Sequence, residues 1–148
     1  MKITICGSIA FYDEMQKIKE KLNTLGHNVD LPPIEVEDDK GGMISVKKFY
    51  DIRKSSVGLN TEWVNKRKKE AMKKHFDKVA WADAVLILNY TKNDIPNYIG
   101  ANTFLEIGVA FYLNKVIYLL NSIPETNYQE EVCGMDPIIL NGDLSKIK

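Results

Sequence analysis

The sequence has few cysteines, no long apolar run and no excess of charge, and each absence excludes a class of protein. Cys6 and Cys133 are the only cysteines in 148 residues. They form neither a CxxC pair nor a disulfide framework, which is typical of a protein from a reduced compartment. No apolar run approaches the ~20 residues that span a bilayer, and residues 1–5 lack the apolar core of a secretion signal. We therefore expect a cytoplasmic protein that does not engage a membrane.

The charge balance and the missing motifs exclude several kinds of ligand. Twenty Lys plus Arg balance twenty Asp plus Glu, so no overall field favours a nucleic acid polymer. The basic clusters at 66–69 and 73–74 suggest a nucleic-acid patch, but a solvated helix face is the favoured interpretation. The chain contains neither GxGxxG nor a P-loop, and its two histidines have no carboxylate cluster at ligand spacing. We expect no cofactor and no metal.

Apolar residues alternate between short continuous runs and stripes with helical spacing. This alternation predicts an α/β fold: a single domain over residues 1–148, with an open parallel five-stranded sheet and helices on both faces, in a flavodoxin-like or Rossmann-like order. The expected strands are 2–6, 27–31, 84–88, 116–120 and 137–140, and the expected helices are 10–25, 61–81, 102–113 and a short one at 125–132.

Residues 34–60 follow no sustained period. The stretch is polar, contains Gly41 and Gly42, and has one candidate short helix at 46–52. Long excursions in compact domains often serve as lids or binding loops. We interpret this one as a variable and mobile excursion that closes over a ligand.

The first strand ends in a turn that could bind a ligand. In open parallel sheets, ligands bind at the carboxyl ends of the strands. Gly7 and Ser8 would present backbone donors there, at the start of a helix, which suits a phosphate or a sugar. A tight turn with Ser8 as the helix cap is an equal alternative. Phe11 and Tyr12 offer a surface for stacking a base, although one of them must also pack in the core.

A second loop leaves the sheet at the same edge and leads into residues 98–108. Gly100 permits an unusual backbone turn, Asn102 or Thr103 can cap the following helix, and Glu106 falls in its first turns. The spacing Thr103-x-x-Glu106 is that of a capping box. The alternative is a carboxylate that the helix dipole keeps ionised and that attacks an anomeric carbon.

A carboxylate nucleophile usually works with a proton donor for the leaving group. His75 lies eight residues before Asp83, or roughly 12 Å back along the helix at 1.5 Å per residue. This distance places His75 near the carboxyl end of the next strand, whereas Asp83 lies at the opposite edge. A histidine at the edge of the core is the bland alternative.

The turn Gly7-Ser8 and the segments 75–86 and 100–110 together resemble the nucleoside 2-deoxyribosyltransferase-like superfamily. That superfamily includes transferases that exchange bases on 2′-deoxyribonucleosides and 2′-deoxynucleoside 5′-phosphate N-hydrolases. The resemblance covers most of the chain outside the excursion. It implies that Glu106 is the nucleophile that attacks C1′. It also implies a homodimer or a higher homo-oligomer, since members often complete their sites across subunits.

The chain departs from the family at two places. Where the family has the aspartate that assists departure of the base, this chain has His75, which can donate a proton near neutral pH. Where the hydrolases have a phosphate-binding arginine after the first Gly-Ser, it has Ile9-Ala10-Phe11, which does not favour a monophosphate.

Three hypotheses follow for function. The first is cleavage or transfer of the N-glycosidic bond of a (2′-deoxy)nucleoside or nucleotide, a small-molecule substrate. Glu106 is then the nucleophile and His75 the acid, and the substrate contacts come from Gly7, Ser8, Phe11, Tyr12, Gly100 and Asn102. The second is a non-catalytic nucleotide- or nucleoside-binding or sensing module with the same fold. The third is a structural domain in which Thr103 and Glu106 only cap a helix.

Overall fold

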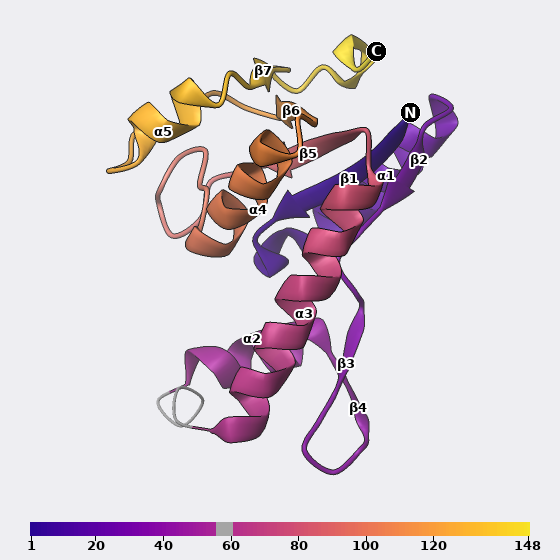
Figure 1. Ribbon diagram of the computed structural model, residues 1–148, viewed down its shortest axis with the longest axis vertical. Helices are drawn as coiled ribbons and strands as arrows, with labels where there is room; N and C mark the ends of the chain where they lie inside the picture. The colour runs from indigo at the N-terminus through magenta and orange to yellow at the C-terminus, as the bar shows by residue number, and fades with distance from the viewer. Residues whose placement is uncertain (56–60) are drawn as a thin grey trace.

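The computed structural model describes residues 1–55 and 61–148. Within them, the main sheet has five strands, all parallel, in the order β2-β1-β5-β6-β7 (Figure 1). Renumbered within the sheet alone, this order is 2-1-3-4-5, which is the flavodoxin-like order. The predicted α/β class and parallel sheet are therefore confirmed. The strands are β1 (Lys2–Gly7), β2 (Asn28–Asp30), β5 (Ala84–Leu88), β6 (Val116–Leu119) and β7 (Ile138–Ile139).

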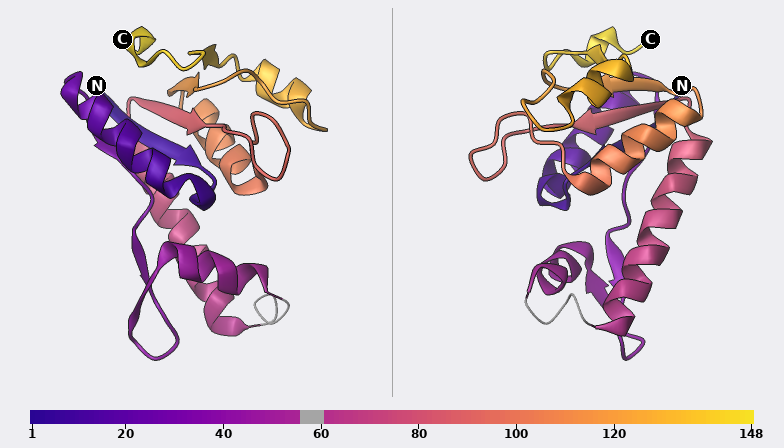
Figure 2. Two further views of the ribbon diagram at one scale, coloured as in Figure 1. Left: turned by 180° about the vertical axis from the view of Figure 1, so that it is seen from behind. Right: turned by 60° about the vertical axis from the view of Figure 1, so that its left-hand side comes forward.

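Helices cover both faces of the sheet, as predicted. Figure 1 shows α3 (Glu62–Trp81) and α4 (Ala101–Tyr112) in front of the sheet, and the reverse view in Figure 2 shows α1 (Tyr12–Thr24) in front of its other face. The short helix η1 (Ile9–Phe11) leads into α1, and α5 (Gln129–Gly134) follows β6. A second short helix, η3 (Leu144–Lys146), lies near the end of the chain.

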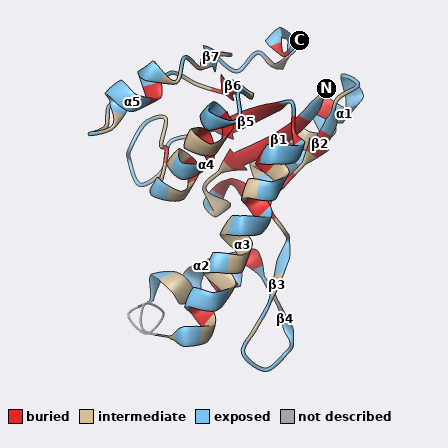
Figure 3. Ribbon diagram, viewed as in Figure 1, coloured by how far each residue is buried: buried red, intermediate tan, exposed pale blue. Residues whose placement is uncertain are grey.

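The core lies on both sides of β1 and β5. All five residues of β5 are buried, as expected of a central parallel strand (Figure 3). Ile3 and Leu86 pack with Met15 of α1 on one face, and Val85 packs with Ile107 of α4 on the other. No helix in the described part of the chain combines the length and the apolarity needed to cross a bilayer.

The excursion at 34–60 is more regular than predicted. It forms an antiparallel hairpin of β3 (Glu35–Glu37) and β4 (Met43–Ser45), followed by α2 (Val46–Lys54), which confirms the short helix expected at 46–52. The last part of the excursion, residues 56–60, lies outside the described residues. Figure 1 shows the hairpin and α2 beside the half of α3 that projects beyond the sheet.

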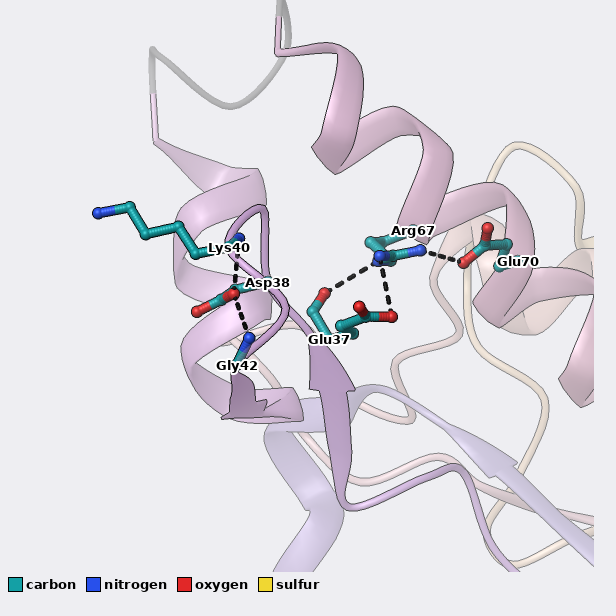
Figure 4. Close-up of polar contacts among 6 residues, drawn as sticks. All are labelled: Glu37, Asp38, Lys40, Gly42, Arg67 and Glu70. Atoms are coloured by element: carbon teal, nitrogen blue, oxygen red, sulfur yellow. Dashed lines mark hydrogen bonds and ion pairs between the residues drawn. The ribbon is translucent and has the colours of Figure 1, made fainter.

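Arg67 of α3 fastens the hairpin to that helix (Figure 4). Its Nε donates to the Glu37 carbonyl at 3.0 Å, and its two terminal nitrogens pair with the carboxylates of Glu37 at 3.0 Å and Glu70 at 2.9 Å. At the hairpin turn, the Asp38 carboxylate accepts from the backbone N–H groups of Lys40 and Gly42. Within the basic cluster 66–69, Lys66 and Lys69 are exposed, as the favoured interpretation of a solvated face expects, whereas Arg67 joins two elements.

Four large apolar side chains of α4 and the turn after it remain exposed. Leu105, Phe111, Tyr112 and Leu113 border a groove between α4 and α5. The expected homo-oligomer stays a prediction.

Candidate functional site

A cavity of about 480 Å³ opens at the carboxyl ends of β1 and β5. Five parts of the chain line it: the turn after β1, the two prolines after β2 (Pro32 and Pro33), the hairpin and α2 of the excursion, one face of α3, and the loop and helix start after β5. Six of the predicted site residues lie in its lining, namely Gly7, Ser8, His75, Gly100, Asn102 and Glu106. The topology therefore brings together groups that are far apart in sequence.

Gly7 and Gly100 both lie where other atoms of the chain approach closely. A Cβ atom on Gly7 would lie 3.0 Å from the carbonyl oxygen of Leu88 and 3.2 Å from Cε of Met15, so the turn needs glycine there. The expectation of an unusual backbone at Gly100 is wrong, because its φ is −81° and its ψ is 168°. A Cβ atom there would instead lie 2.8 Å from the hydroxyl oxygen of Tyr98.

The start of α4 excludes the capping-box interpretation. The N-cap residue is Gly100, with no side-chain cap bond, so neither Asn102 nor Thr103 is the cap as expected. Glu106 lies more than one turn into the helix, too far along to reach back to the cap. Its Oε1 instead accepts a hydrogen bond of 2.7 Å from Nδ2 of Asn102, one turn earlier. Asn102 is therefore a positioning group for the carboxyl of Glu106.

Glu106 and His75 face each other at the floor of the cavity. Oε2 of Glu106 lies 3.8 Å from Nε2 of His75, and the residues are 3% and 4% exposed. Neither this oxygen nor either ring nitrogen has a hydrogen-bond partner in the described part of the chain. Buried polar atoms are nearly always paired in folded proteins, so these three atoms mark a place for a ligand.

Burial sets the charge state of this pair. It raises the pKa of Glu106 to about 8, although the Cys6 thiol, the Lys68 ammonium and the Asn102 amide favour the carboxylate. The expectation that the helix dipole keeps Glu106 ionised is therefore wrong for the empty cavity. Burial, with help from the charge of Lys78, lowers the pKa of His75 to about 4. At neutral pH the proton of the pair lies on Glu106, whereas the sequence led us to expect it on His75.

Cys6 completes a buried cluster behind the pair. It lies at the end of β1, is 0% exposed, and burial together with the charge of Glu106 raises the pKa of its thiol. Its Sγ, a nitrogen of His75 and an oxygen of Glu106 all lie within 4.8 Å of one another. These three donors could hold a metal ion, which the spacing of the residues in the sequence did not suggest.

Cations dominate the mouth of the cavity. Nζ of Lys92 donates to Oγ of Ser8 and to the hydroxyl of Tyr50, both at 2.8 Å. Lys92 lies 5.1 Å from the centroid of the Tyr50 ring, and Arg53 and Lys54 of α2 each lie 5.5 Å from it. Three cations thus surround one aromatic ring.

Lys68 adds a fourth cation between the mouth and the floor. Its Nζ donates to Oδ1 of Asn102 at 2.9 Å, and burial together with the charge of Arg53 lowers its pKa to about 8. None of the four cations pairs with a carboxylate among residues 1–55 and 61–148. Unpaired cations gathered at one concave site favour an anionic ligand.

Two predicted substrate contacts do not reach the cavity. Phe11 is buried and packs edge-on against Tyr90, with ring centroids 5.5 Å apart. Tyr12 is buried too, and its hydroxyl donates to the carbonyl of Pro32 at 3.3 Å. Neither residue is part of the cavity lining: Tyr12 joins the core cluster that includes Met15, and Phe11 packs against Tyr90.

The residues that sequence reasoning missed are the cations and Tyr50. Lys68 had a usable signal: it lies seven residues, or two helical turns, before His75 and so shares its face of α3. Lys92 also had one, since it follows a buried strand at the carboxyl edge. Tyr50 and Arg53 had none, because nothing in the excursion shows where α2 packs.

Nine solved chains are similar to this one, and two of them are described below. No family model matches the chain, and no curated protein matches it. One similar structure is a 2-deoxyribosyltransferase from Bacillus psychrosaccharolyticus, with 18% identity, a TM-score of 0.49, and coverage of 81% of this chain and 72% of that one. The other is the CMP N-glycosidase BcmB of Clostridium botulinum, with 15% identity, a TM-score of 0.46, and coverage of 94% and 85%.

The opposed pKa shifts predict how stability depends on pH. The raised pKa of Glu106 gives stability that is complete below pH 4.5 and is lost as the pH rises to about 8. The lowered pKa of His75 gives stability that is complete above pH 6.5 and is lost as the pH falls to about 4. Between pH 4.5 and 6.5 the two effects cancel. From pH 6.5 to 8, Glu106 alone removes about 1.4 kcal/mol per pH unit.

Urea unfolding of the wild type and of Glu106→Gln at each pH measures this effect. The difference in unfolding free energy should change steadily between pH 6.5 and 8 in favour of the variant. In the variant, the loss of stability in acid that is due to His75 should become visible between pH 6.5 and 4. A difference that does not change with pH would contradict the charge states given above.

Proposed function

We propose that this protein cleaves or transfers the N-glycosidic bond of a nucleoside or nucleotide, with Glu106 as the nucleophile. The observation that carries the proposal is the pair of unpartnered atoms at the floor of the cavity, Oε2 of Glu106 and Nε2 of His75, 3.8 Å apart. A carboxylate beside a second proton-carrying group is the equipment that glycosidic chemistry uses. The comparisons, in which both solved structures are proteins of nucleoside or nucleotide chemistry by their names, point the same way.

The reaction proceeds in two steps. An oxygen of the Glu106 carboxylate attacks C1′ of the sugar, the bond between C1′ and the base nitrogen breaks, and the base leaves with the electron pair and takes up a proton. A glycosyl ester on Glu106 remains. Water, or the nitrogen of a second base, then attacks C1′ and releases Glu106 as a carboxylate. Water gives hydrolysis and a second base gives transfer.

One shared proton can serve both groups of the pair. In the empty cavity Glu106 holds this proton and His75 is neutral. Transfer of the proton from Glu106 to Nε2 of His75 would create the nucleophile and the acid in one move. The imidazolium then protonates the departing base. Asn102 favours this transfer, because the hydrogen bond that its side-chain amide donates to Oε1 of Glu106 stabilises the carboxylate.

The cationic mouth favours a phosphorylated substrate. The sequence lacks the arginine expected after Gly7-Ser8, but Lys92 reaches Ser8 from the loop after β5 and supplies a charge at the same turn. Arg53 and Lys54 reach the same place from α2. If these cations bind the 5′-phosphate, the sugar of the substrate extends toward the floor of the cavity, where Glu106 lies.

A non-catalytic nucleotide-binding module is the second candidate. The charge states of the empty cavity favour it, because a protonated Glu106 is a poor nucleophile and a neutral His75 is a poor acid. The two candidates differ in one result. A binding module holds the nucleotide and releases no base.

Replacement of Glu106 by glutamine tests the nucleophile. Glu106→Gln should reduce base release by more than roughly 10³-fold, since the amide cannot form the glycosyl ester. Chromatography of free base from a panel of nucleosides and their 5′-phosphates measures this loss. Glu20→Gln, an exposed position on α1, is the matched control and should retain full activity. Undiminished turnover in Glu106→Gln would remove the proposed mechanism, and binding without any base release in the wild type would favour the second candidate.

The pH dependence tests the shared proton. If one proton serves the pair, kcat/KM is level between about pH 4 and 8 and falls above 8, where the pair loses that proton. If Glu106 acts without His75, kcat/KM instead rises tenfold per pH unit up to about 8. His75→Gln should lose roughly 10²–10⁴-fold on natural bases. It should lose little on a p-nitrophenyl glycoside, whose leaving group needs no proton.

Replacement of Lys92 tests the phosphate site. Lys92→Met should raise KM for a nucleoside 5′-phosphate by roughly 10–100-fold, since a charged hydrogen bond contributes about 1.5–3 kcal/mol. KM for the unphosphorylated nucleoside and kcat for both should change little. Lys69→Met, at an exposed position on α3, controls for a general loss of positive charge. An equal rise in KM for both substrates would place the phosphate elsewhere.

A further inference from the structure

The mechanism above leaves one member of the buried cluster unused. Cys6 is fully buried at the end of β1, directly behind the carboxyl of Glu106, and no step of the glycosidic reaction needs a thiol. Its Sγ, a His75 nitrogen and a Glu106 oxygen lie within 4.8 Å of one another. They come from three separate elements, β1, α3 and α4.

The dimensions of the cluster suit a small divalent ion. Around a tetrahedral zinc ion with bonds of about 2.0–2.3 Å, ligand atoms lie roughly 3.3–3.7 Å apart. His75 and Glu106 are already 3.8 Å apart, and neither other separation exceeds 4.8 Å. Movements of about 1 Å or less at the ends of the side chains would bring the three ligand atoms to the separations found around zinc.

The free atoms are the ones that a metal needs. Oε2 of Glu106 and both ring nitrogens of His75 have no partner among the described residues, although both side chains are more than nine-tenths buried. Oε1 of Glu106 is held by Asn102, in the way that ligating carboxylates are held by neighbouring hydrogen bonds. The mixed donor set of thiolate, imidazole and carboxylate favours zinc over magnesium or calcium, which prefer oxygen alone.

We propose that Cys6, His75 and Glu106 bind one Zn²⁺ ion through Sγ, a ring nitrogen and Oε2, with a fourth position open to the cavity. Three protein ligands and one open position are the pattern of an accessible zinc site. The thiol proton of Cys6 and the carboxyl proton of Glu106 pass to solvent as the ion binds, so the bound ion and its two anionic ligands are neutral together. The ion reaches the site through the cavity, which His75 and Glu106 line.

Zinc and substrate exclude each other at this site. Both use the carboxylate of Glu106, so a bound ion blocks attack on C1′ and removes the proton that the pair shares. Zinc is then an inhibitor that competes with the substrate. This consequence rests on the proposed function, whereas binding of the ion does not.

Cobalt(II) is the probe for binding, because it occupies zinc sites and its bond to a thiolate gives a charge-transfer absorption. The metal-free chain of 148 residues should bind one Co²⁺ in equilibrium dialysis and show that absorption, which an equivalent of Zn²⁺ should abolish. Cys6→Ser should lose the thiolate band. Cys133→Ser is the matched control, since Cys133 is the other, exposed cysteine, and it should keep the band.

Two further variants keep the test decisive if Cys6→Ser does not fold. Glu106→Gln preserves shape and His75→Gln preserves polarity, and each should weaken binding by at least tenfold while circular dichroism shows a folded chain. Absence of the band in the wild type would overturn the proposal. A band that survives in Cys6→Ser, or disappears in Cys133→Ser, would overturn it as well.

The inhibition is measured separately on the wild type. Added Zn²⁺ should raise KM for the substrate without changing kcat, and a chelator should reverse the effect. If zinc binds as described but no substrate is turned over, the proposed function fails and the metal site stands. If base release depends on Glu106 but zinc neither binds nor inhibits, the metal site fails and the proposed function stands.

Discussion

The burial of the Glu106 carboxyl group is the constraint on which the site depends. A buried carboxylate without full pairing is unfavourable by several kcal/mol, so the empty protein keeps the proton there. A hydrogen bond from Asn102 holds one oxygen and leaves the other facing His75. The chain thus stores an anionic group in neutral form at the floor of the cavity, ready for a ligand that favours its charge.

The long helix α3 connects this floor to the cationic mouth. Its C-terminal half packs on the sheet and places His75 opposite Glu106, while its N-terminal half extends past the sheet and holds the excursion through Arg67. Lys68, the residue after Arg67, donates a hydrogen bond to Asn102 of α4. Because one rigid helix carries Lys68 and His75, the spacing between these two groups is fixed by helix geometry.

The parts of the fold that follow from local patterns were predictable. The continuous apolar run of β5 predicted a strand covered on both faces of a parallel sheet. The apolar stripe of α1, with residues every three or four positions, predicted a helix buried on one face. The hairpin was not predictable: β3 and β4 have three residues each and are stabilised by Arg67 from a distant helix. The local sequence around the hairpin does not indicate a contact with a residue so far along the chain.

Six lining residues of the candidate site, Glu106 among them, were predictable, but the cations around it and its charge states were not. Glu106 stood out because it follows a loop at the carboxyl edge of the sheet. The helix cap was expected at Asn102 or Thr103, because both residue types are common caps. The structure places the cap at Gly100 instead. The charge states could not be read from sequence either, because they depend on burial. Phe11 and Tyr12 could not be assigned for the same reason: which face of a helix start is buried depends on what packs there.

The histidine at position 75 changes the charge balance of the whole cavity. Two carboxyl groups that share one proton carry a net charge of −1, whereas a carboxyl and an imidazole that share one proton carry none. The cations at Arg53, Lys54, Lys68 and Lys92 are therefore not offset by the floor of the cavity, and no carboxylate among the described residues pairs with them. An anionic ligand, as proposed above, would neutralise them. A phosphate supplies the negative charge without entering the buried floor, where the desolvation that raises the pKa of Glu106 would oppose a second anion. His75 and the cationic mouth are thus two parts of one charge arrangement, which suits the anionic substrate proposed above.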